Sequence, residues 1–132
     1  MKNIELPIST LAYIGDAVYE LIIRVAVLNT YKAKSGAIHQ KVIKLVNATA
    51  QANALTRIET ILSEKEKALV KRAANQSVPS ARPVDPTDYR LATGFEALLG
   101  FLLLENDYER LYEVLSQAEP ELQFEKSFLQ NN

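Results

Sequence analysis

The sequence predicts an all-α protein, and three observations support this prediction. Long stretches are rich in Ala, Leu, Ile, Lys and Glu, and most of these residues favour helices. No run alternates apolar and polar residues with the period of two that a half-buried strand requires. The 132 residues include only four glycines and no tryptophan. We find no internal repeat and expect one domain over residues 1–132, since this length supports a single core.

The first helix is predicted to begin within residues 7–10, where Ser9 or Thr10 can act as the N-cap, and to end at about Leu28. Its apolar side chains form one wide stripe, which consists of Leu11, Ile14, Val18, Leu21, Ile22, Val25 and Leu28. The polar strip is narrow and consists of Asp16, Glu20 and Arg24. We therefore expect this helix to be central and buried on nearly all sides.

Two further helical regions follow. Residues 37–62 form the first of them, and the cap-favouring residues 47–49 can divide it into two helices. Residues 63–75 form the next predicted helix, because Ser63 and Glu66 have the spacing of a capping box.

A long loop is predicted over residues 76–86, which contain three prolines, because proline cannot continue a helix interior. Asp85 and Pro86 then have the pattern of an N-cap and a first-turn proline. This pattern predicts that the apolar segment over residues 87–106 is a helix.

The C-terminal part begins with a second capping pattern at residues 106–109, which predicts an acidic helix that Pro120 ends. We expect residues 120–132 to form a short helix or to lack regular structure. The core of the domain is therefore predicted to span about residues 9–118.

The charge distribution is asymmetric although the net charge is only -1. Residues 1–90 hold 13 Lys and Arg against 8 Asp and Glu, whereas residues 91–132 hold 2 against 8. A basic N-terminal region beside an acidic C-terminal one is compatible with nucleic-acid binding on one surface.

The cellular compartment is indicated by what the sequence lacks. There is no cysteine, so disulfides and thiolate metal sites are excluded, which fits a reducing compartment. No segment has the apolar run of a signal peptide or the roughly 20 apolar residues of a membrane span. We expect a soluble cytoplasmic protein without membrane association.

Asp16 is the only charged residue between Leu11 and Tyr19, and Glu96 is the only one between Leu91 and Leu104, within the two most hydrophobic predicted helices. An ionised carboxylate in such a setting is costly unless it is paired with a cation or a metal. Gly15 and Gly100 lie beside these acids and would let the two helices pack closely. We therefore expect Asp16 and Glu96 to form one site, where oxygen ligands favour a hard ion such as Mg²⁺.

The sequence alone also allows a purely structural role for the same two acids. Asp16 belongs to a strip with the spacing of four that solvated salt bridges favour. Glu96 can pair with Arg90 or Lys71 in the fold. Neither pairing would require a metal.

Two motifs resemble those of ribonuclease III enzymes. LAYIGDAVYE at residues 11–20 is similar to their signature helix, and TGFEALLGFLLLE at residues 93–105 is similar to their second acidic helix. Between them, KLVNATAQANAL at residues 44–55 resembles the connecting segment of the family. The resemblance spans about residues 9–118. The chain is too short to include the double-stranded-RNA-binding domain of the larger enzymes, so we expect the minimal class, Mini-ribonuclease III.

The resemblance implies a function and a fold. It implies an all-helical homodimer with the ribonuclease III endonuclease-domain fold, in which each subunit contributes one site. It implies Mg²⁺-dependent cleavage of double-stranded RNA, with Mn²⁺ as a substitute ion, and maturation of large-subunit ribosomal RNA precursors. Asp16 matches the signature aspartate and Glu96 matches the second-motif glutamate, so the resemblance assigns both as catalytic metal ligands. The implied products carry a 5′ phosphate and a 3′ hydroxyl.

Two positions depart from the pattern of the larger enzymes. Ala12 stands where they have a glutamate one turn before the signature aspartate, and Thr93 stands where they have an aspartate three residues before the second glutamate. The minimal enzymes resemble this sequence in lacking both of these acids. The number of metal ions is therefore left open.

The resemblance also indicates where RNA would bind. Minimal enzymes tend to have an Arg-Gly-Arg-Asn-Ala-Lys-like run where this chain has residues 71–76, with Gln76 in place of the final lysine. The candidate RNA-binding residues are Lys71, Arg72, Asn75 and Arg82. Two alternatives remain: a noncatalytic RNA-binding or ribosome-associated protein that keeps the fold as a scaffold, and an unrelated helical dimer that binds proteins. A noncatalytic scaffold could replace Asp16 and Glu96 with apolar residues, so the presence of both acids argues against the scaffold alternative.

Overall fold

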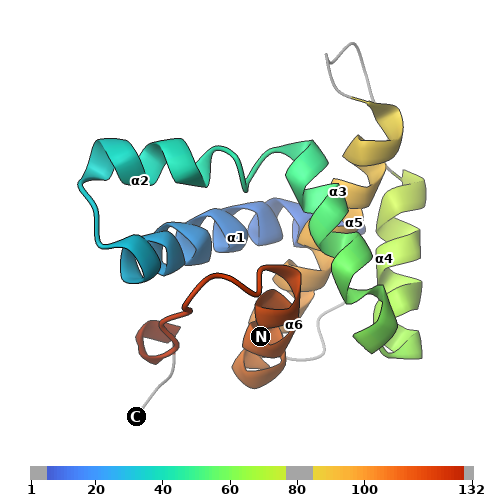
Figure 1. Ribbon diagram of the computed structural model, residues 1–132. Coiled ribbons are helices and arrows are strands. Elements are labelled where there is room, and N and C mark those ends of the chain that lie inside the picture. The colour runs from blue at the N-terminus through green and yellow to red at the C-terminus, as the bar shows by residue number, and fades with distance from the viewer. Residues whose placement is uncertain (1–5, 77–84, 130–132) are drawn as a thin grey trace.

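The computed structural model describes residues 6–76 and 85–129, and within these ranges it contains helices and no strand. The all-α prediction is therefore confirmed (Figure 1). The elements in chain order are α1 (Ile8–Tyr31), α2 (Ser35–Val42), α3 (Ala48–Ile58), η1 (Glu59–Ile61), α4 (Glu64–Gln76), α5 (Pro86–Leu104), α6 (Tyr108–Ala118) and η2 (Ser127–Leu129).

The centre of the molecule is the crossing of α1 and α5, which make the most extensive contact between any two elements of the described chain. Tyr19 of α1 and Phe95 of α5 are fully buried at this crossing. Their rings meet edge to face with centroids 5.1 Å apart. Two helices far apart in the sequence thus form one rigid core.

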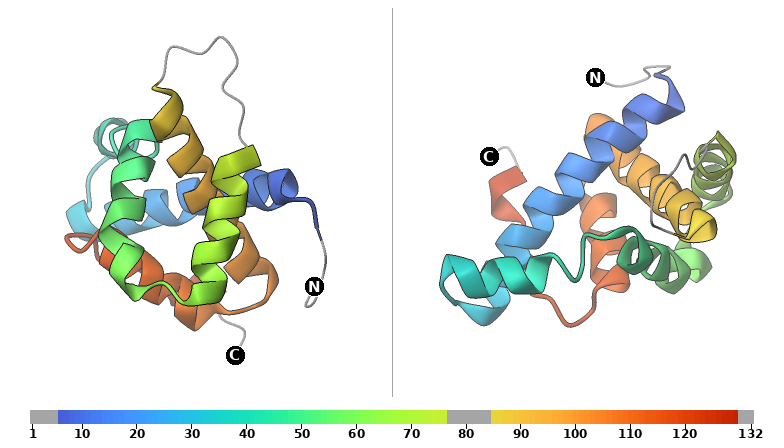
Figure 2. Two further views of the ribbon diagram at one scale, coloured as in Figure 1. Left: turned by 90° about the vertical axis from the view of Figure 1, so that its right-hand side faces the viewer. Right: turned by 90° about the horizontal axis from the view of Figure 1, so that it is seen from above.

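The other helices pack around this pair. Figure 2 shows α5 between α3 and α4, and both of these helices pack on it. Helix α2 packs on α1, and α6 packs on α3 and α5. No helix of the described residues is long and apolar enough to cross a membrane.

The starts of α3, α4, α5 and α6 follow the predicted caps. The side chain of Asn47 accepts a hydrogen bond from the Ala50 amide at 2.8 Å, so the region over residues 37–62 does divide there. Ser63 and Glu66 form the reciprocal bonds of a capping box, at 2.8 and 3.1 Å. Asp85 caps α5 and Asp107 caps α6, each by accepting backbone N–H groups. The predicted loop over residues 76–86 lies mostly outside the described residues.

Helix α1 begins at Ile8, within the predicted residues 7–10, but its N-cap and its C-terminal end differ from the prediction. Its N-cap is Pro7, without a side-chain cap, so the expected role of Ser9 or Thr10 is wrong. The helix continues past Leu28 to Tyr31 and ends at Lys32, which has a left-handed backbone with φ of 51°.

The expected burial of α1 on nearly all sides is also wrong. The side chains of Tyr13, Leu21 and Leu28 are 78%, 52% and 52% exposed. Spacings of eight and seven residues place these three side chains along one face of the helix. The buried residues of α1 lie on the other faces, so these three side chains remain as an exposed apolar stripe, which adjoins the Glu20–Arg24 ion pair.

The C-terminal segment returns to α1 rather than leaving the fold. The backbone N–H of Gln123 donates to the Thr30 hydroxyl at 2.7 Å, and the Asn29 side chain donates to the Gln123 carbonyl at 3.0 Å. Glu119, only 2% exposed, accepts hydrogen bonds from Arg57 at 2.9 Å and Tyr19 at 3.3 Å. The described part of the tail therefore packs against α1, and Glu119 at the end of α6 is bonded to α1 and α3.

Candidate active site

The crossing of α1 and α5 is so close that glycine is required on both helices. A Cβ atom on Gly15 would lie 1.6 Å from the carbonyl oxygen of Glu96. A Cβ atom on Gly100 would lie 2.0 Å from the carbonyl oxygen of Leu11. The close packing that the two glycines predicted is therefore present, and it sets Asp16 beside Glu96.

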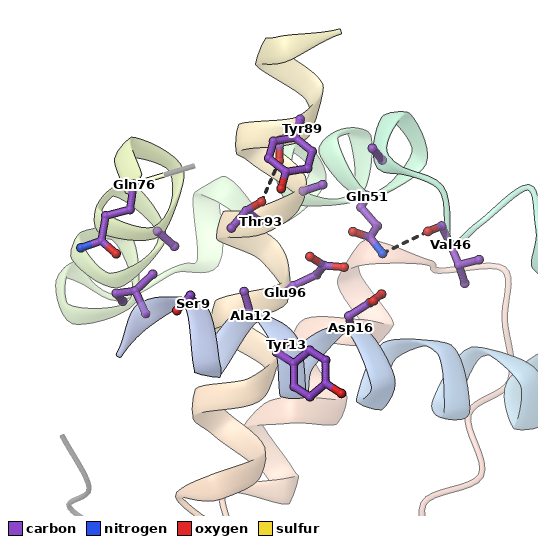
Figure 3. A pocket seen from close by; sticks show the side chains of 14 residues that line it. Ser9, Ala12, Tyr13, Asp16, Val46, Gln51, Gln76, Tyr89, Thr93 and Glu96 are labelled. Carbon is purple, nitrogen blue, oxygen red and sulfur yellow. Dashed lines mark hydrogen bonds between the residues drawn. The ribbon is translucent and has the colours of Figure 1, made fainter. Parts of the chain in front are cut away.

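A pocket of about 520 Å³ opens at this crossing, between α1, α3, α4 and α5. Asp16, Glu96 and Gln51 line it from three different helices. Figure 3 shows these three side chains pointing toward a common space. Thr93 also lines the pocket, and its hydroxyl donates to the Tyr89 carbonyl at 3.0 Å.

The two acids differ in environment. Asp16 is exposed at the mouth of the pocket, whereas Glu96 is half-buried. Burial of Glu96 raises its pKa to about 8, and the neighbouring Asp16 carboxylate adds to this rise. A hydrogen bond from Gln51 acts in the opposite direction on this pKa. The expectation of a costly buried carboxylate therefore holds for Glu96 but not for Asp16.

The structural interpretation of the acids finds no support in the described residues. No ion pair joins Asp16 or Glu96 to a lysine or arginine in residues 6–76 and 85–129. In the polar strip of α1 the ion pair is between Glu20 and Arg24, at 2.7 Å. Two adjacent carboxylates without a basic partner attract a cation.

The donor set of the pocket suits a hard divalent ion. Carboxylate oxygens and an amide are the ligand types that Mg²⁺ binds, with water completing its shell. The described chain has no group of three or more His, Cys, Asp and Glu residues placed to hold a metal. Ala12 and Thr93 line the pocket at the two positions where the larger enzymes have further acids. The protein site thus offers two carboxylates.

Gln51 is the pocket residue that the sequence analysis missed. It is 2% exposed, and its side-chain nitrogen donates to the Val46 carbonyl at 3.2 Å. Its helical spacing from Leu55 and Ile58, which are buried on α3, is the sequence feature that could have identified it. A glutamine on the apolar face of a helix is a buried polar group that needs partners.

The predicted RNA-binding residues fall into three groups. Arg72 and Asn75 are exposed on α4, the helix whose last residue, Gln76, lines the pocket. Lys71 lines a separate groove between α3, α4 and α5. Arg82 lies outside the described residues.

Comparison with known proteins identifies the class. The family model described as the ribonuclease III domain matches residues 9–107. The chain therefore belongs to the ribonuclease III family, and it is an endoribonuclease of the kind that acts on double-stranded RNA.

Its relatives narrow this class. The chain is 44% identical over 106 residues to a Mini-ribonuclease 3 of Thermoanaerobacter sp. (strain X514). This alignment covers 80% of this chain and 75% of the relative. It is 41% identical over 114 residues to the Mini-ribonuclease 3 of Symbiobacterium thermophilum, with coverage of 86% and 88%. A crystal structure of a Fusobacterium nucleatum protein superposes with a TM-score of 0.76 at 28% identity, covering 85% and 90%. The resemblance to Mini-ribonuclease III is confirmed.

Proposed function

We propose that Asp16 and Glu96 hold Mg²⁺ in the pocket and that this site hydrolyses the phosphodiester bonds of double-stranded RNA. The observation that carries the proposal is the convergence of these two carboxylates from α1 and α5. In the described residues neither acid has a basic partner. A cation between the carboxylates would offset their mutual repulsion and the burial of Glu96.

The chemistry assigns clear roles to the chain. When bound, Mg²⁺ supplies a water of lowered pKa and neutralises charge that develops on the phosphate. Asp16 is exposed and would be the acid nearer to the RNA backbone, whereas Glu96 is half-buried. The pocket needs no protein nucleophile. The products would be a 5′ phosphate and a 3′ hydroxyl, with Mn²⁺ able to replace Mg²⁺.

RNA binding is proposed along α4 toward the pocket. Arg72 and Asn75 are exposed on this helix and can contact phosphates, and Gln76 lines the pocket itself. Duplex RNA is bound through its backbone and shape, because side chains cannot read its deep, narrow major groove. Lys71 and Arg82 remain proposed contacts on the flanks of this surface.

A homodimer is proposed on the exposed apolar stripe of α1. Tyr13 of this stripe also lines the site pocket, so a second copy seated there would lie beside the active site. Two sites in one dimer would cut both strands of a duplex. The resemblance to Mini-ribonuclease III supports precursor large-subunit ribosomal RNA as the substrate, and the absence of cysteine suits activity in the cytoplasm.

The experiment uses purified protein, long double-stranded RNA and Mg²⁺. We expect cleavage by the unchanged protein and by Glu109→Gln, which removes an exposed acid on α6. We expect loss of cleavage in Asp16→Asn and Glu96→Gln, with unchanged helical circular dichroism. Cleavage that survives both substitutions would refute the assigned site. RNA binding without cleavage in any divalent ion would favour the scaffold alternative.

A further inference from the structure

Gln51 is a nearly fully buried polar side chain in the wall of the pocket, with 2% exposure. Burial of an amide costs free energy unless its donors and acceptors find partners. The proposed roles of Asp16 and Glu96 do not by themselves require an amide at this place. Its partners therefore indicate what it does.

One partner fixes how the amide lies. The Gln51 side-chain nitrogen donates to the Val46 carbonyl at 3.2 Å. A carbonyl oxygen accepts hydrogen bonds but cannot donate one, so the nitrogen end of the amide must face Val46. The amide nitrogen carries two N–H groups, and the bond to Val46 uses one of them.

The second N–H group has Glu96 within reach. The Gln51 and Glu96 side chains point toward each other in the pocket (Figure 3). The N–H group that the bond to Val46 leaves free is therefore available to the Glu96 carboxylate. A donor aimed at a carboxylate fixes the direction in which its oxygens point, as the hydrogen-bond partners of metal ligands do.

The backbone that carries Gln51 is held in place. Asn47 caps α3 one turn earlier by accepting the Ala50 N–H at 2.8 Å, and its side chain also donates to the Ile43 carbonyl at 3.1 Å. Leu55 and Ile58 of the same helix are buried in the core. Gln51 is therefore presented from a packed, capped helix rather than from a loop.

We propose that Gln51 is a positioning residue, whose amide is anchored on the Val46 carbonyl and holds the Glu96 carboxylate turned toward Asp16. This inference rests on the proposed function, because it assigns the amide to the same metal site. The amide itself need not touch the metal or the RNA. Partners of this kind orient a metal ligand, and their loss typically weakens metal affinity or activity about 10- to 100-fold.

The test compares Gln51→Met with Asn53→Leu. Both changes replace an amide by an aliphatic side chain of similar size on α3, but Asn53 is exposed. Three quantities are measured: Mn²⁺ affinity by calorimetry without RNA, the Mg²⁺ concentration that gives half-maximal cleavage, and thermal unfolding without metal. Gln51→Asn, which keeps an amide on a shorter side chain, is measured in parallel.

We expect Gln51→Met to weaken Mn²⁺ binding and to raise the half-maximal Mg²⁺ concentration by at least about 10-fold. Asn53→Leu should leave both at the values of the unchanged protein. Gln51→Asn should shift both in the same direction as Gln51→Met, and it supplies the measurement if Gln51→Met does not fold.

The outcomes separate this inference from the proposed function. If the unchanged protein binds Mn²⁺ and cleaves RNA while folded Gln51 variants keep its metal affinity, the positioning role is wrong and the proposed function stands. A Gln51 variant with a lower unfolding temperature but unchanged metal affinity would likewise show that Gln51 only stabilises the fold. If the unchanged protein neither binds Mn²⁺ nor cleaves RNA, both proposals fail.

Discussion

Gly15→Ala is the substitution for which the structure gives the most definite expectation. The added Cβ would lie 1.6 Å from the Glu96 carbonyl oxygen, whereas ordinary contact begins at 3.4 Å. The obstacle is helix backbone, which cannot rotate aside as a side chain can. The helices would therefore have to separate by up to about 1.8 Å, the difference between these two distances.

The free-energy cost follows from two opposing effects. Overpacking costs about 1–3 kcal/mol, and a clash with backbone belongs at the upper end of this range. Alanine is a better helix former than glycine by about 1 kcal/mol, which offsets part of that cost. A net loss of about 2 kcal/mol would lower the melting temperature by roughly 8 °C in a domain of this size. Separation of the helices also moves Glu96 from Asp16, and a misplacement of about 1 Å costs on the order of 100-fold in rate.

The assay is thermal unfolding by circular dichroism together with RNA cleavage. Gly36→Ala is the matched control, because a Cβ on Gly36 meets no atom within 4 Å. We expect this control to be unchanged or slightly stabilised. A Gly15→Ala protein that melts and cleaves like the unchanged one would refute the close crossing of α1 and α5.

The other predictions concern charge, RNA binding and association. Without divalent ions, stability should fall as pH rises from about 4.5 to about 8, because the unfolded state releases a proton that folded Glu96 retains. Glu96→Gln should flatten this pH profile in thermal unfolding, and an unchanged profile would contradict the raised pKa. In an Asp16→Asn background, Arg72→Ala should weaken RNA binding and reduce its salt slope by about 1. Equal binding before and after that change would exclude Arg72 as a phosphate contact. Leu21→Asp should convert a dimer to a monomer in sedimentation, and a dimer that persists would place the interface elsewhere.

Local sequence signals predicted the starts of α3 to α6 because capping is a local interaction. Ser63 and Glu66 bond each other across three residues, so their spacing alone identifies the capping box. The end of α1 could not be predicted in this way. Thr30 bonds back to the Ala26 carbonyl at 2.7 Å and also accepts the Gln123 amide at 2.7 Å. The second bond comes from the other end of the chain.

The candidate site could be predicted in part. Asp16 and Glu96 were identifiable because each is the only charged residue in an apolar stretch of its helix and has a glycine nearby, and the structure brings them into one pocket. The exposed stripe of α1 was not identifiable, because an apolar pattern shows that a face avoids water but not what covers it. Gln51 was overlooked for a related reason. Its role depends on facing Glu96, and sequence spacing does not reveal which helix lies opposite.

The crossing of α1 with α5 also bears on the order in which the protein matures during its synthesis. Helix α1 leaves the ribosome first, but its contacts with α5 and with Gln123 are supplied by much later parts of the chain. Contacts of such long sequence separation form slowly, and unfinished chains expose apolar surface until they do. If Asp16 and Glu96 hold the metal as proposed, a nascent chain carries only one of the two acids until residue 96 has been added, so the site cannot be assembled before α5 has been synthesised.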